Sequence, residues 1–174
     1  GVVVFLARPA SRAPKGKPWH LVVNFTGPHN PMDITASMEP GSRGRKYPQP
    51  NASTEFDPAT HTAIRQNYTA MCENIDRRIG EILAAVAARG ELDNTLVVFS
   101  SDHGEMLGDH NRWGKHVPYQ ASAGIPLVVA GLDARRGLRT PAMASLIDVA
   151  ATFLDYAGAP ALPGMDARSL RPVL

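Results

Sequence analysis

The sequence predicts an α/β fold, in which a layered, mixed β-sheet is flanked by helices. Short apolar runs rich in β-branched residues, at 19–27, 92–101 and 124–132, have the composition of buried strands. Two longer segments, 60–88 and 145–158, repeat their apolar residues at steps of three and four, as one face of a helix does. Strands that alternate with helices along a chain are typical of layered α/β sheets.

The bulk composition is that of one globular domain. With 174 residues, of which 44% are hydrophobic and 20% charged, the chain can bury a single core. The net charge is +2 and the Lys and Arg residues are scattered, so we expect neither nucleic acid nor a membrane surface as a partner. No run reaches the ~20 apolar residues of a membrane span. The composition leaves the oligomeric state open.

The single cysteine and the first residues narrow the possibilities further. Cys72 is the only cysteine, so the chain has no intrachain disulfide and no cysteine-based zinc site. Residues 1–17 lack the leading basic segment and the long apolar core of a signal peptide, which favours a cytoplasmic location. Because the chain opens with Gly1 rather than Met, we expect its true N-terminus to lie upstream.

The first predicted strand leads into a loop that holds a candidate site residue. The run "WHLVVNFTG" ends at Gly27, and the Pro-punctuated loop "PHNPMD" with His29 follows it. Residues 37–58 then contain several glycines and prolines and predict one long irregular loop. Loops of this length are uncommon unless they cover a site or are disordered.

Both predicted helices end at a glycine. Gly90 stops the first helix and Gly158 the second, since glycine favours the conformation that terminates a helix. The apolar face of the first helix consists of Ile64, Tyr68, Met71, Ile75, Ile79, Ile82, Leu83 and Val86. Cys72 lies one helical step from Tyr68 and Ile75, and we therefore interpret it as a core residue.

A polar cluster begins where the second predicted strand ends. The stretch "SSDHGEMLGDHNRWGKH", residues 100–116, holds three His, two Asp, a Glu and a Lys. In open α/β sheets, ligands bind outside the carboxyl ends of the strands. The first strand delivers His29 to such an end and the second delivers Asp102 and His103, so the sequence predicts a binding site there.

The residue types suggest a cation next to an anion. A tight turn, which Gly104 permits, would let Asp102 and His103 converge on one metal ion. A carboxylate suits Ca²⁺ or Mg²⁺, whereas an imidazole favours Mn²⁺, Zn²⁺ or Fe, and two ligands are too few for any of them. Lys115 and His116 would supply positive charge for an anionic substrate. Taken alone, the pattern leaves open that Asp102 and His103 only cap a polar loop.

These residues stand in a known order. "SSDHGEMLGDHNRWGKHVPYQASAGIPLVVAG" resembles the sulfatase signature of the alkaline phosphatase superfamily. "NFTGPHNPMD" is similar to the family's strand and P-H-x-P element, and "ASLIDVAATFLDYAGAPALPGMDARSL" to its later helix and M-D-G-x-S-L stretch, with Ala167 where Gly is usual. The resemblance covers nearly the whole chain, and its combined order and spacing are specific.

The resemblance implies roles for the candidate residues. Asp102 and His103 match two metal ligands, with Ca²⁺ expected and Mn²⁺ possible because His103 stands where many sulfatases have Asn. Lys115, thirteen positions after Asp102, matches the lysine that binds the sulfate oxygens. His29 matches the histidine near the ester oxygen, which binds substrate and protonates the leaving group. His116 is expected to support substrate binding without ligating the metal.

Other polar residues of the cluster have plainer interpretations. We expect Asp109 and His110 to bond loop backbone. We expect Trp113 to pack the loop.

The chain also departs from the family pattern. Sulfatases carry an early D-D or D-x-x-x-D metal element and a C/S-x-P-S/A-x-R motif, whose Cys or Ser becomes formylglycine, the nucleophile in its hydrated form. Neither motif is in the sequence, and Cys72 is followed by "ENI". The resemblance thus implies that residues 1–174 are a partial, alkaline-phosphatase-like catalytic domain, without its N-terminal half and its C-terminal subdomain. The fragment alone is expected to be inactive.

Three functions follow from the sequence. The first is part of a metal-dependent sulfatase that hydrolyses small-molecule sulfate monoesters through a formylglycine outside this sequence. The second is a phosphonate monoester or phosphodiester hydrolase of the same superfamily. The third is a non-catalytic binding module that kept the sheet without the chemistry.

Overall fold

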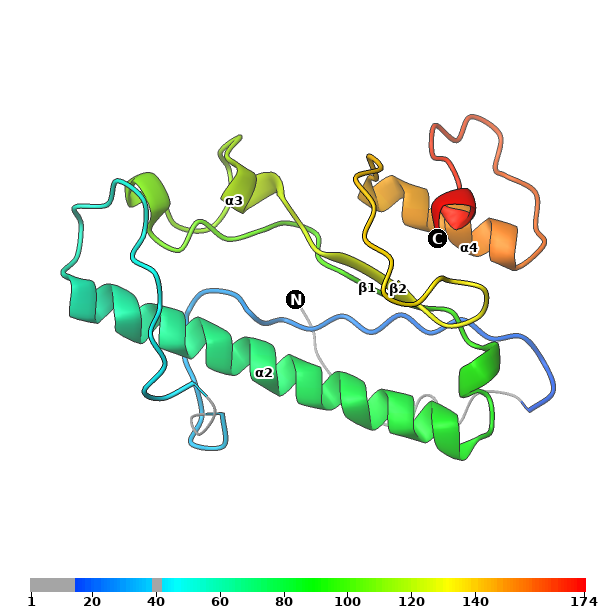
Figure 1. Cartoon of the computed structure of the whole chain (residues 1–174), viewed down its shortest axis with the longest axis horizontal. Coiled ribbons are helices and arrows are strands. Elements are labelled where there is room, and N and C mark those ends of the chain that lie inside the picture. Colours follow the sequence, from blue (N-terminus) through cyan, green and yellow to red (C-terminus); the bar gives the residue numbers. More distant parts are fainter. Residues whose placement is uncertain (1–14, 39–41) are drawn as a thin grey trace. The chain divides into compact units, whose positions relative to one another are not determined.

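The long periodic segment forms one helix, α2 (Pro58–Ala88), in a computed structural model that describes residues 15–38 and 42–174 (Figure 1). Asp57 caps the helix, because its Oδ1 accepts the backbone N–H groups of Ala59 at 2.8 Å and Thr60 at 3.1 Å. Beyond Ala88 the chain turns at Gly90, whose φ of +71° is the left-handed conformation that ends many helices. The predicted helix is therefore confirmed, two residues longer at its start.

The chain divides into two compact, interleaved units. One consists of Gly1–Leu92 and His103–Gly124, and the other of Asp93–Asp102 and Ile125–Leu174. Residues 1–14, which include most of the segment examined for a signal peptide, lie outside the described residues, as do residues 39–41 of the predicted loop. No helix of the described residues is long and apolar enough to cross a membrane.

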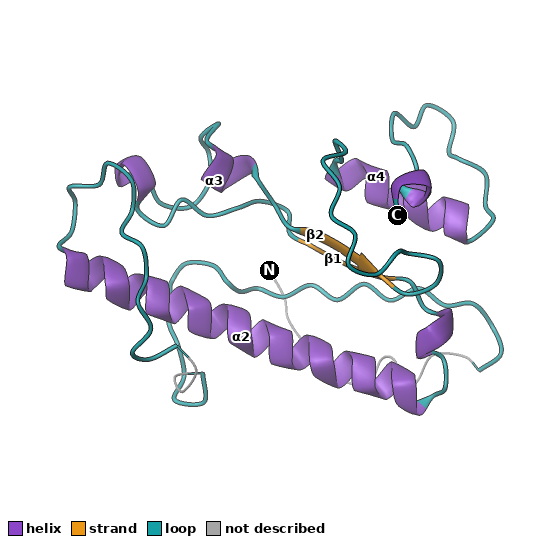
Figure 2. Ribbon diagram, in the orientation of Figure 1, coloured by secondary structure: helices purple, strands orange, loops and turns teal. Residues whose placement is uncertain are grey.

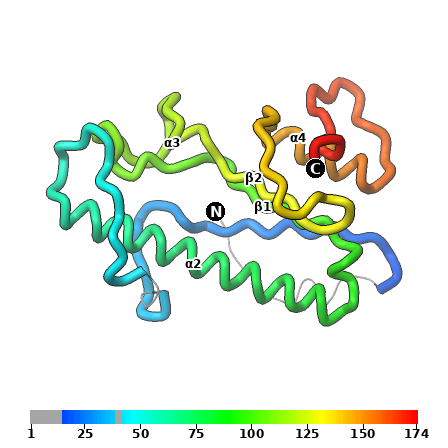
Figure 3. The backbone as a smooth tube through the Cα atoms, in the orientation of Figure 1, coloured from blue at the N-terminus to red at the C-terminus, as the bar shows by residue number. Residues whose placement is uncertain are grey.

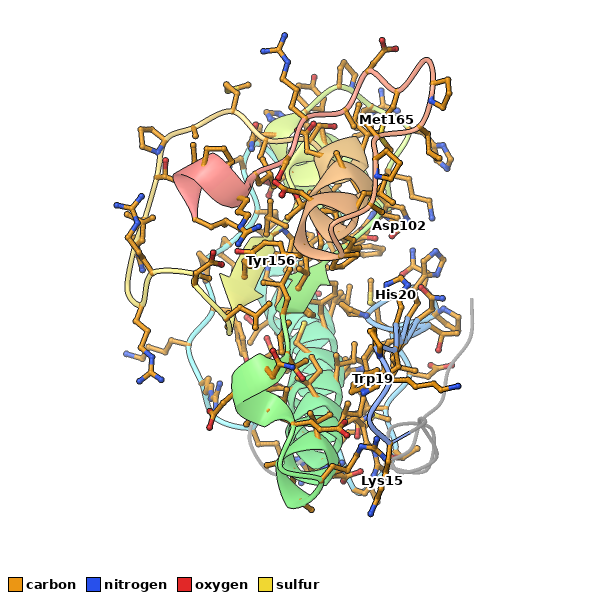
Figure 4. All side chains as sticks on the ribbon, turned by 90° about the vertical axis from the view of Figure 1, so that its right-hand side faces the viewer. Lys15, Trp19, His20, Asp102, Tyr156 and Met165 are labelled. Atoms are coloured by element: carbon orange, nitrogen blue, oxygen red, sulfur yellow. The ribbon has the colours of Figure 1, made fainter. Side chains whose placement is uncertain are left out.

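Residues 18–32 run alongside α2 in the first unit (Figures 1 and 3). At one end, the indole N–H of Trp19 donates to Glu91 at 2.9 Å, just beyond α2 (Figure 4). Further along, a Cβ at Gly27 would lie 3.2 Å from Cε of Met71, and Asn67 donates to the carbonyl of Met32 at 2.9 Å. Residues 18–32 thus follow α2, and the loop at residues 28–31 lies near the middle of the helix.

The predicted strand at 19–27 is not assigned as a strand in the structure. Exposure does alternate along residues 21–26, as in a strand with one covered face. A segment counts as a strand only when its backbone pairs with a neighbour, and periodicity within the segment does not specify that neighbour. The sequence predicted a buried, paired strand, whereas the structure shows a segment without a paired neighbour among the described residues and with alternate residues exposed, such as Val22.

The second unit contains the sheet (Figure 2). After the 3₁₀ turn η1 (Leu92–Asn94), strand β1 (Val97–Ser100) pairs antiparallel with β2 (Leu127–Ala130), with Val97 opposite Ala130 and Ser100 opposite Leu127. Gly131, with φ of +90°, has no room for a side chain, since a Cβ would lie 2.0 Å from the carbonyl oxygen of Thr95. The described residues thus hold two strands of the predicted layered sheet.

Helix α4 (Leu146–Tyr156) confirms the second predicted helix. Asp148 accepts the N–H of Ser145 at 2.8 Å at the helix start and the N–H of Arg168 at 2.9 Å from the chain beyond the helix. Thr152, 2% exposed, accepts the N–H of Leu170 at 2.9 Å. These bonds tie α4 to the segment before the last 3₁₀ turn, η3 (Arg171–Val173).

Candidate functional site

Lys115 and His29 meet in the first unit, although 86 positions separate them in the chain. The Lys115 Nζ lies 2.9 Å from Nε2 of His29. The other ring nitrogen of His29, Nδ1, lies 2.7 Å from the carbonyl oxygen of Asn30. Because a carbonyl oxygen only accepts, Nδ1 carries the hydrogen, and Nε2 offers its lone pair to the ammonium of Lys115.

His103 joins the same cluster. Its ring centroid lies 6.2 Å from that of His29, with the two rings at 64°. Nδ1 of His103 lies 2.8 Å from the carbonyl oxygen of Gly104 and therefore donates to it. The lone pair of the ring is then on Nε2, and a backbone carbonyl that fixes the tautomer in this way is typical of metal-ligating histidines.

Gly104 places His103 through close packing. Its N–H donates to the carbonyl of Ser122 at 2.8 Å, next to the short helix α3 (Gln120–Ala123). A Cβ on Gly104 would lie 2.1 Å from the carbonyl oxygen of Ala121, a distance that no side chain tolerates. Its φ is not positive. Glycine is thus required here for the close approach of two backbones, and not for the unusual turn that the sequence suggested.

Asp102 directly precedes His103, and its side chain is exposed. The boundary between the two compact units falls between these residues. They are therefore related to each other only by the peptide bond that joins them. A carboxylate and an imidazole are a donor set that divalent cations accept. Among residues 15–38 and 42–174, no group of three or more His, Cys, Asp or Glu side chains could hold a metal ion. Two donors alone do not complete the coordination of such a cation.

His116 directly follows Lys115 in the chain, and no hydrogen bond or ring contact joins its side chain to the cluster among the described residues. It is exposed, and it adopts a φ of +81°, which is rare for a residue with a side chain. The structure thus brings together His29, His103 and Lys115 of the predicted site residues.

The segment from Glu105 to Lys115, which we call the Lys115 loop, is anchored at its outer end. Oδ1 of Asp109 accepts the N–H of Asn51 at 3.0 Å, and the N–H of His110 donates to the carbonyl of Asn51 at 2.7 Å. The 3₁₀ turn η2 (Asp109–Asn111) ends at Asn111, whose Oδ1 accepts the N–H of Thr54 at 2.7 Å. Asp109 and His110 thus bond loop backbone, as predicted, and the long predicted loop is held where it meets them (Figure 3).

A buried histidine, His61, supports the same outer end and was missed in the sequence. It is 3% exposed, and its ring stacks on Trp113, with centroids 6.0 Å apart and planes at 10°. Ser53 donates to Oδ1 of Asn111, so its oxygen accepts from Nε2 of His61 at 3.1 Å. Nδ1 of His61 is buried without a partner, against Gly108. Only its position on the apolar side of the helical repeat could have indicated burial.

Glu105 holds the inner end of the Lys115 loop. Its Oε1 accepts the N–H of Gly114 at 2.6 Å and the N–H of Leu107 at 3.2 Å. The N–H of Met106 donates to the carbonyl of Gly114 at 2.9 Å. Burial, with the negative charges of Cys72 and Glu105, raises the pKa of Tyr68 to about 12. The Glu105 carboxylate therefore lies close enough to α2 to affect a side chain on it.

The described residues thus form an α/β chain in which a lysine and two imidazoles gather on one compact unit. The family model described as Sulfatase matches residues 5–159. Arylsulfatase K from Homo sapiens is 37% identical over 123 residues, which are 71% of this chain and 23% of that protein. The chain belongs to the sulfatase family. It spans about a quarter of the length of the curated relatives it matches.

Two solved structures are similar as well. The phosphonate monoester hydrolase from Silicibacter pomeroyi has a TM-score of 0.65 and 35% identity, over 69% of this chain and 24% of that one. A second structure, with a TM-score of 0.63 and 33% identity over 67% of this chain and 24% of the other, was solved in complex with its substrate D-glucosamine-2-N,6-O-disulfate. The predicted α/β, alkaline-phosphatase-like fold class is confirmed by these neighbours.

Proposed function

We propose that this chain carries the anion-binding residues and two metal ligands of an enzyme that hydrolyses sulfate monoesters. The observation that carries the proposal is the meeting of Lys115, His29 and His103. Lys115 lies 2.9 Å from His29, whose ring is 6.2 Å from that of His103. A cation, a proton carrier and a metal-ligating nitrogen are the groups that the cleavage of a sulfate ester calls for.

Lys115 and His29 have complementary tasks in this proposal. The ammonium of Lys115 acts as a point charge on the non-bridging oxygens of the sulfate. The same ammonium donates a hydrogen bond to Nε2 of His29 in the structure. If the ammonium donates to a bound anion instead, the lone pair of Nε2 becomes available. Nε2 can then take up a proton from water, and the resulting imidazolium can pass that proton to the ester oxygen, which leaves more readily as a neutral alcohol.

Asp102 and His103 are the residues that would hold a divalent cation. Ca²⁺ suits the carboxylate, and Mn²⁺ suits the added imidazole. Bound there, the cation would supply positive charge next to the sulfate oxygens. We propose that further ligands, and the formylglycine nucleophile implied by the family resemblance, come from sequence other than residues 1–174.

A second candidate is the hydrolysis of phosphonate monoesters or phosphodiesters. Two observations favour it: the 35% identity to a phosphonate monoester hydrolase, and His103, which stands where many sulfatases have Asn. Both reactions attack a tetrahedral centre with anionic oxygens, so Lys115 and His29 would serve either substrate. The choice between the two esters is thus a question for kinetics.

The test compares residues 1–174 with a longer chain that contains them, matured by a formylglycine-generating system. We expect the longer chain to release phenol from an aryl sulfate, and Lys115→Ala to lower that rate by about 10²-fold or more. Residues 1–174 alone should release none, because the groups of such a site act as a unit. Faster release from an aryl phosphonate would establish the second candidate. No release from either ester by the longer chain would point to a binding module.

A further inference from the structure

Glu105 joins the two ends of the Lys115 loop through one carboxylate oxygen. Oε1 accepts the N–H of Leu107 at 3.2 Å, near the start of the loop, and the N–H of Gly114 at 2.6 Å, near its end. Hydrogen bonds to an ionised acceptor are shorter and stronger than those between neutral groups. The carboxylate therefore closes a loop in which Glu105 and Gly114 are nine positions apart.

Residues of the candidate site lie next to both ends of this closed loop. His103 lies two positions before Glu105, and Lys115 directly follows Gly114. Beyond the closure, Lys115 contacts His29 at 2.9 Å, and the ring of His29 lies 6.2 Å from that of His103. His103 and Lys115 are thus connected in two ways. One runs along the chain through the Glu105 carboxylate and Gly114, and the other runs through contacts with the His29 ring.

One backbone hydrogen bond, from the Met106 N–H to the Gly114 carbonyl at 2.9 Å, joins the same two ends of the loop as the Glu105 carboxylate does. Two side-chain anchors of the loop act at a different place. Asp109 binds the backbone of Asn51, and the indole N–H of Trp113 donates to Glu55 at 2.7 Å. These contacts hold the outer end of the loop to residues 51–55. They do not set the separation between His103 and Lys115, because neither of them joins Gly114 to the start of the loop.

We infer that Glu105 is a positioning residue that holds Lys115 against His29 and sets its separation from His103. The positioning of Lys115 by Glu105 would affect anion binding, and this consequence rests on the proposed function. The contact between Lys115 and His29 exists without substrate, so the positioning itself can be measured separately.

The experiment uses residues 1–174 labelled with ¹⁵N, in four forms: wild type, Glu105→Ala, Glu105→Gln and Glu55→Ala. Two readouts report positioning: the ¹⁵N shift of His29 Nε2, which is sensitive to its hydrogen bond, and the hydrogen exchange of the Gly114 amide. A third, the Kd for inorganic sulfate, reports function. Glu105→Asp, whose shorter side chain cannot span both N–H groups, replaces Glu105→Ala if that variant does not fold.

We expect Glu105→Ala to shift His29 Nε2, to speed Gly114 exchange by about tenfold or more, and to weaken sulfate binding by about tenfold, because the closing hydrogen bonds are lost. Glu105→Gln keeps an acceptor oxygen at the same place, so it should restore all three readouts. The matched control Glu55→Ala removes the acceptor of the Trp113 indole N–H at the outer end of the loop and should leave the His29 shift unchanged.

The outcomes separate the two claims. An unchanged His29 shift in Glu105→Ala overturns the positioning role, whatever sulfate does. Equal effects of Glu105→Ala and Glu55→Ala also overturn it, because any loss of loop contacts would then suffice. A wild type that shows the Lys115–His29 contact, and loses it in Glu105→Ala, but binds no sulfate, contradicts the proposed function and leaves the positioning role intact.

Discussion

The lack of a side chain at Gly104 determines the position of His103, the candidate metal-ligating residue. The backbone there approaches the turn around Ala121 so closely that a Cβ would lie 2.1 Å from a carbonyl oxygen. The same residue accepts the ring N–H of His103 with its own carbonyl, at 2.8 Å. Displacing the backbone of Gly104 therefore displaces the ring of His103.

Gly104→Ala should lower the free energy of unfolding by about 2 kcal/mol or more, because a backbone clash has no side chain that could move aside. Gly80→Ala is the matched control. Gly80 lies within α2 with nothing within 4 Å of its missing Cβ, so alanine there should stabilise the chain by up to about 1 kcal/mol. Urea unfolding measures both variants. A Gly104→Ala chain as stable as Gly80→Ala would contradict the close approach described here.

The residues of the site differ in how far the sequence could predict them. His29, His103 and Lys115 were named from the polar residues that follow the predicted strands, and the family resemblance then implied their roles. Both kinds of information concern order in the chain and do not specify contacts. The structural roles of His61 and Glu105 were missed, because a histidine in a helix and a glutamate after a glycine are ordinary in sequence. Their roles depend on residues far away in the chain, such as Trp113 for His61.

The elements show the same division between local and long-range information. Helix α2 was predicted because its apolar repeat and its end at Gly90 are encoded within the segment, whereas its N-cap, Asp57, was assigned to the preceding loop. The segment 19–27 has the alternation of a strand, but a strand also requires a hydrogen-bonded neighbour that its own sequence does not name. Helix α4 combines both kinds of information, since Asp148 caps its start and also binds Arg168 beyond its end.

The double role of Asp148 makes α4 sensitive to acid. The N–H groups of Arg168 and Ser145 hold the pKa of the Asp148 carboxyl below its ordinary value of 3.8. A lowered folded-state pKa contributes stability that is present above the unfolded-state pKa and is lost as the pH falls through the folded-state value. The urea midpoint of the wild type should therefore drop more between pH 6 and pH 3 than that of Asp148→Asn. Equal drops would show that Asp148 does not govern the acid response.

At the scale of the whole molecule, the chain alternates between its two compact units. The sheet of the second unit forms from β1 before the Lys115 loop and β2 after it. Each unit is therefore discontinuous in sequence, and neither can be cut out as a single stretch without including or losing part of the other.

The fragment 125–174 should not keep the structure it has in the full chain. It retains β2 and α4 but lacks β1, the strand with which β2 pairs. An isolated helix as short as the 11 residues of α4 is only marginally stable in water. Amide hydrogen exchange should find residues 127–130 unprotected in this fragment and protected in residues 1–174. The fragment 93–174, which restores β1, is the control, and equal protection in 125–174 would contradict the dependence on β1.

The hydrogen bond between Lys115 and His29 also has a consequence for selectivity among anions. The Lys115 ammonium already donates a hydrogen bond to His29 at 2.9 Å. Binding an anion at Lys115 therefore replaces this hydrogen bond with one to the anion. The net gain on binding is then an exchange free energy, and an anion with a single diffuse charge, such as chloride, offers little more than the imidazole does. A doubly charged tetrahedral oxyanion offers several oxygens and a stronger field, so the exchange favours it. Under the proposed function, the contact between Lys115 and His29 would therefore favour sulfate over monovalent anions.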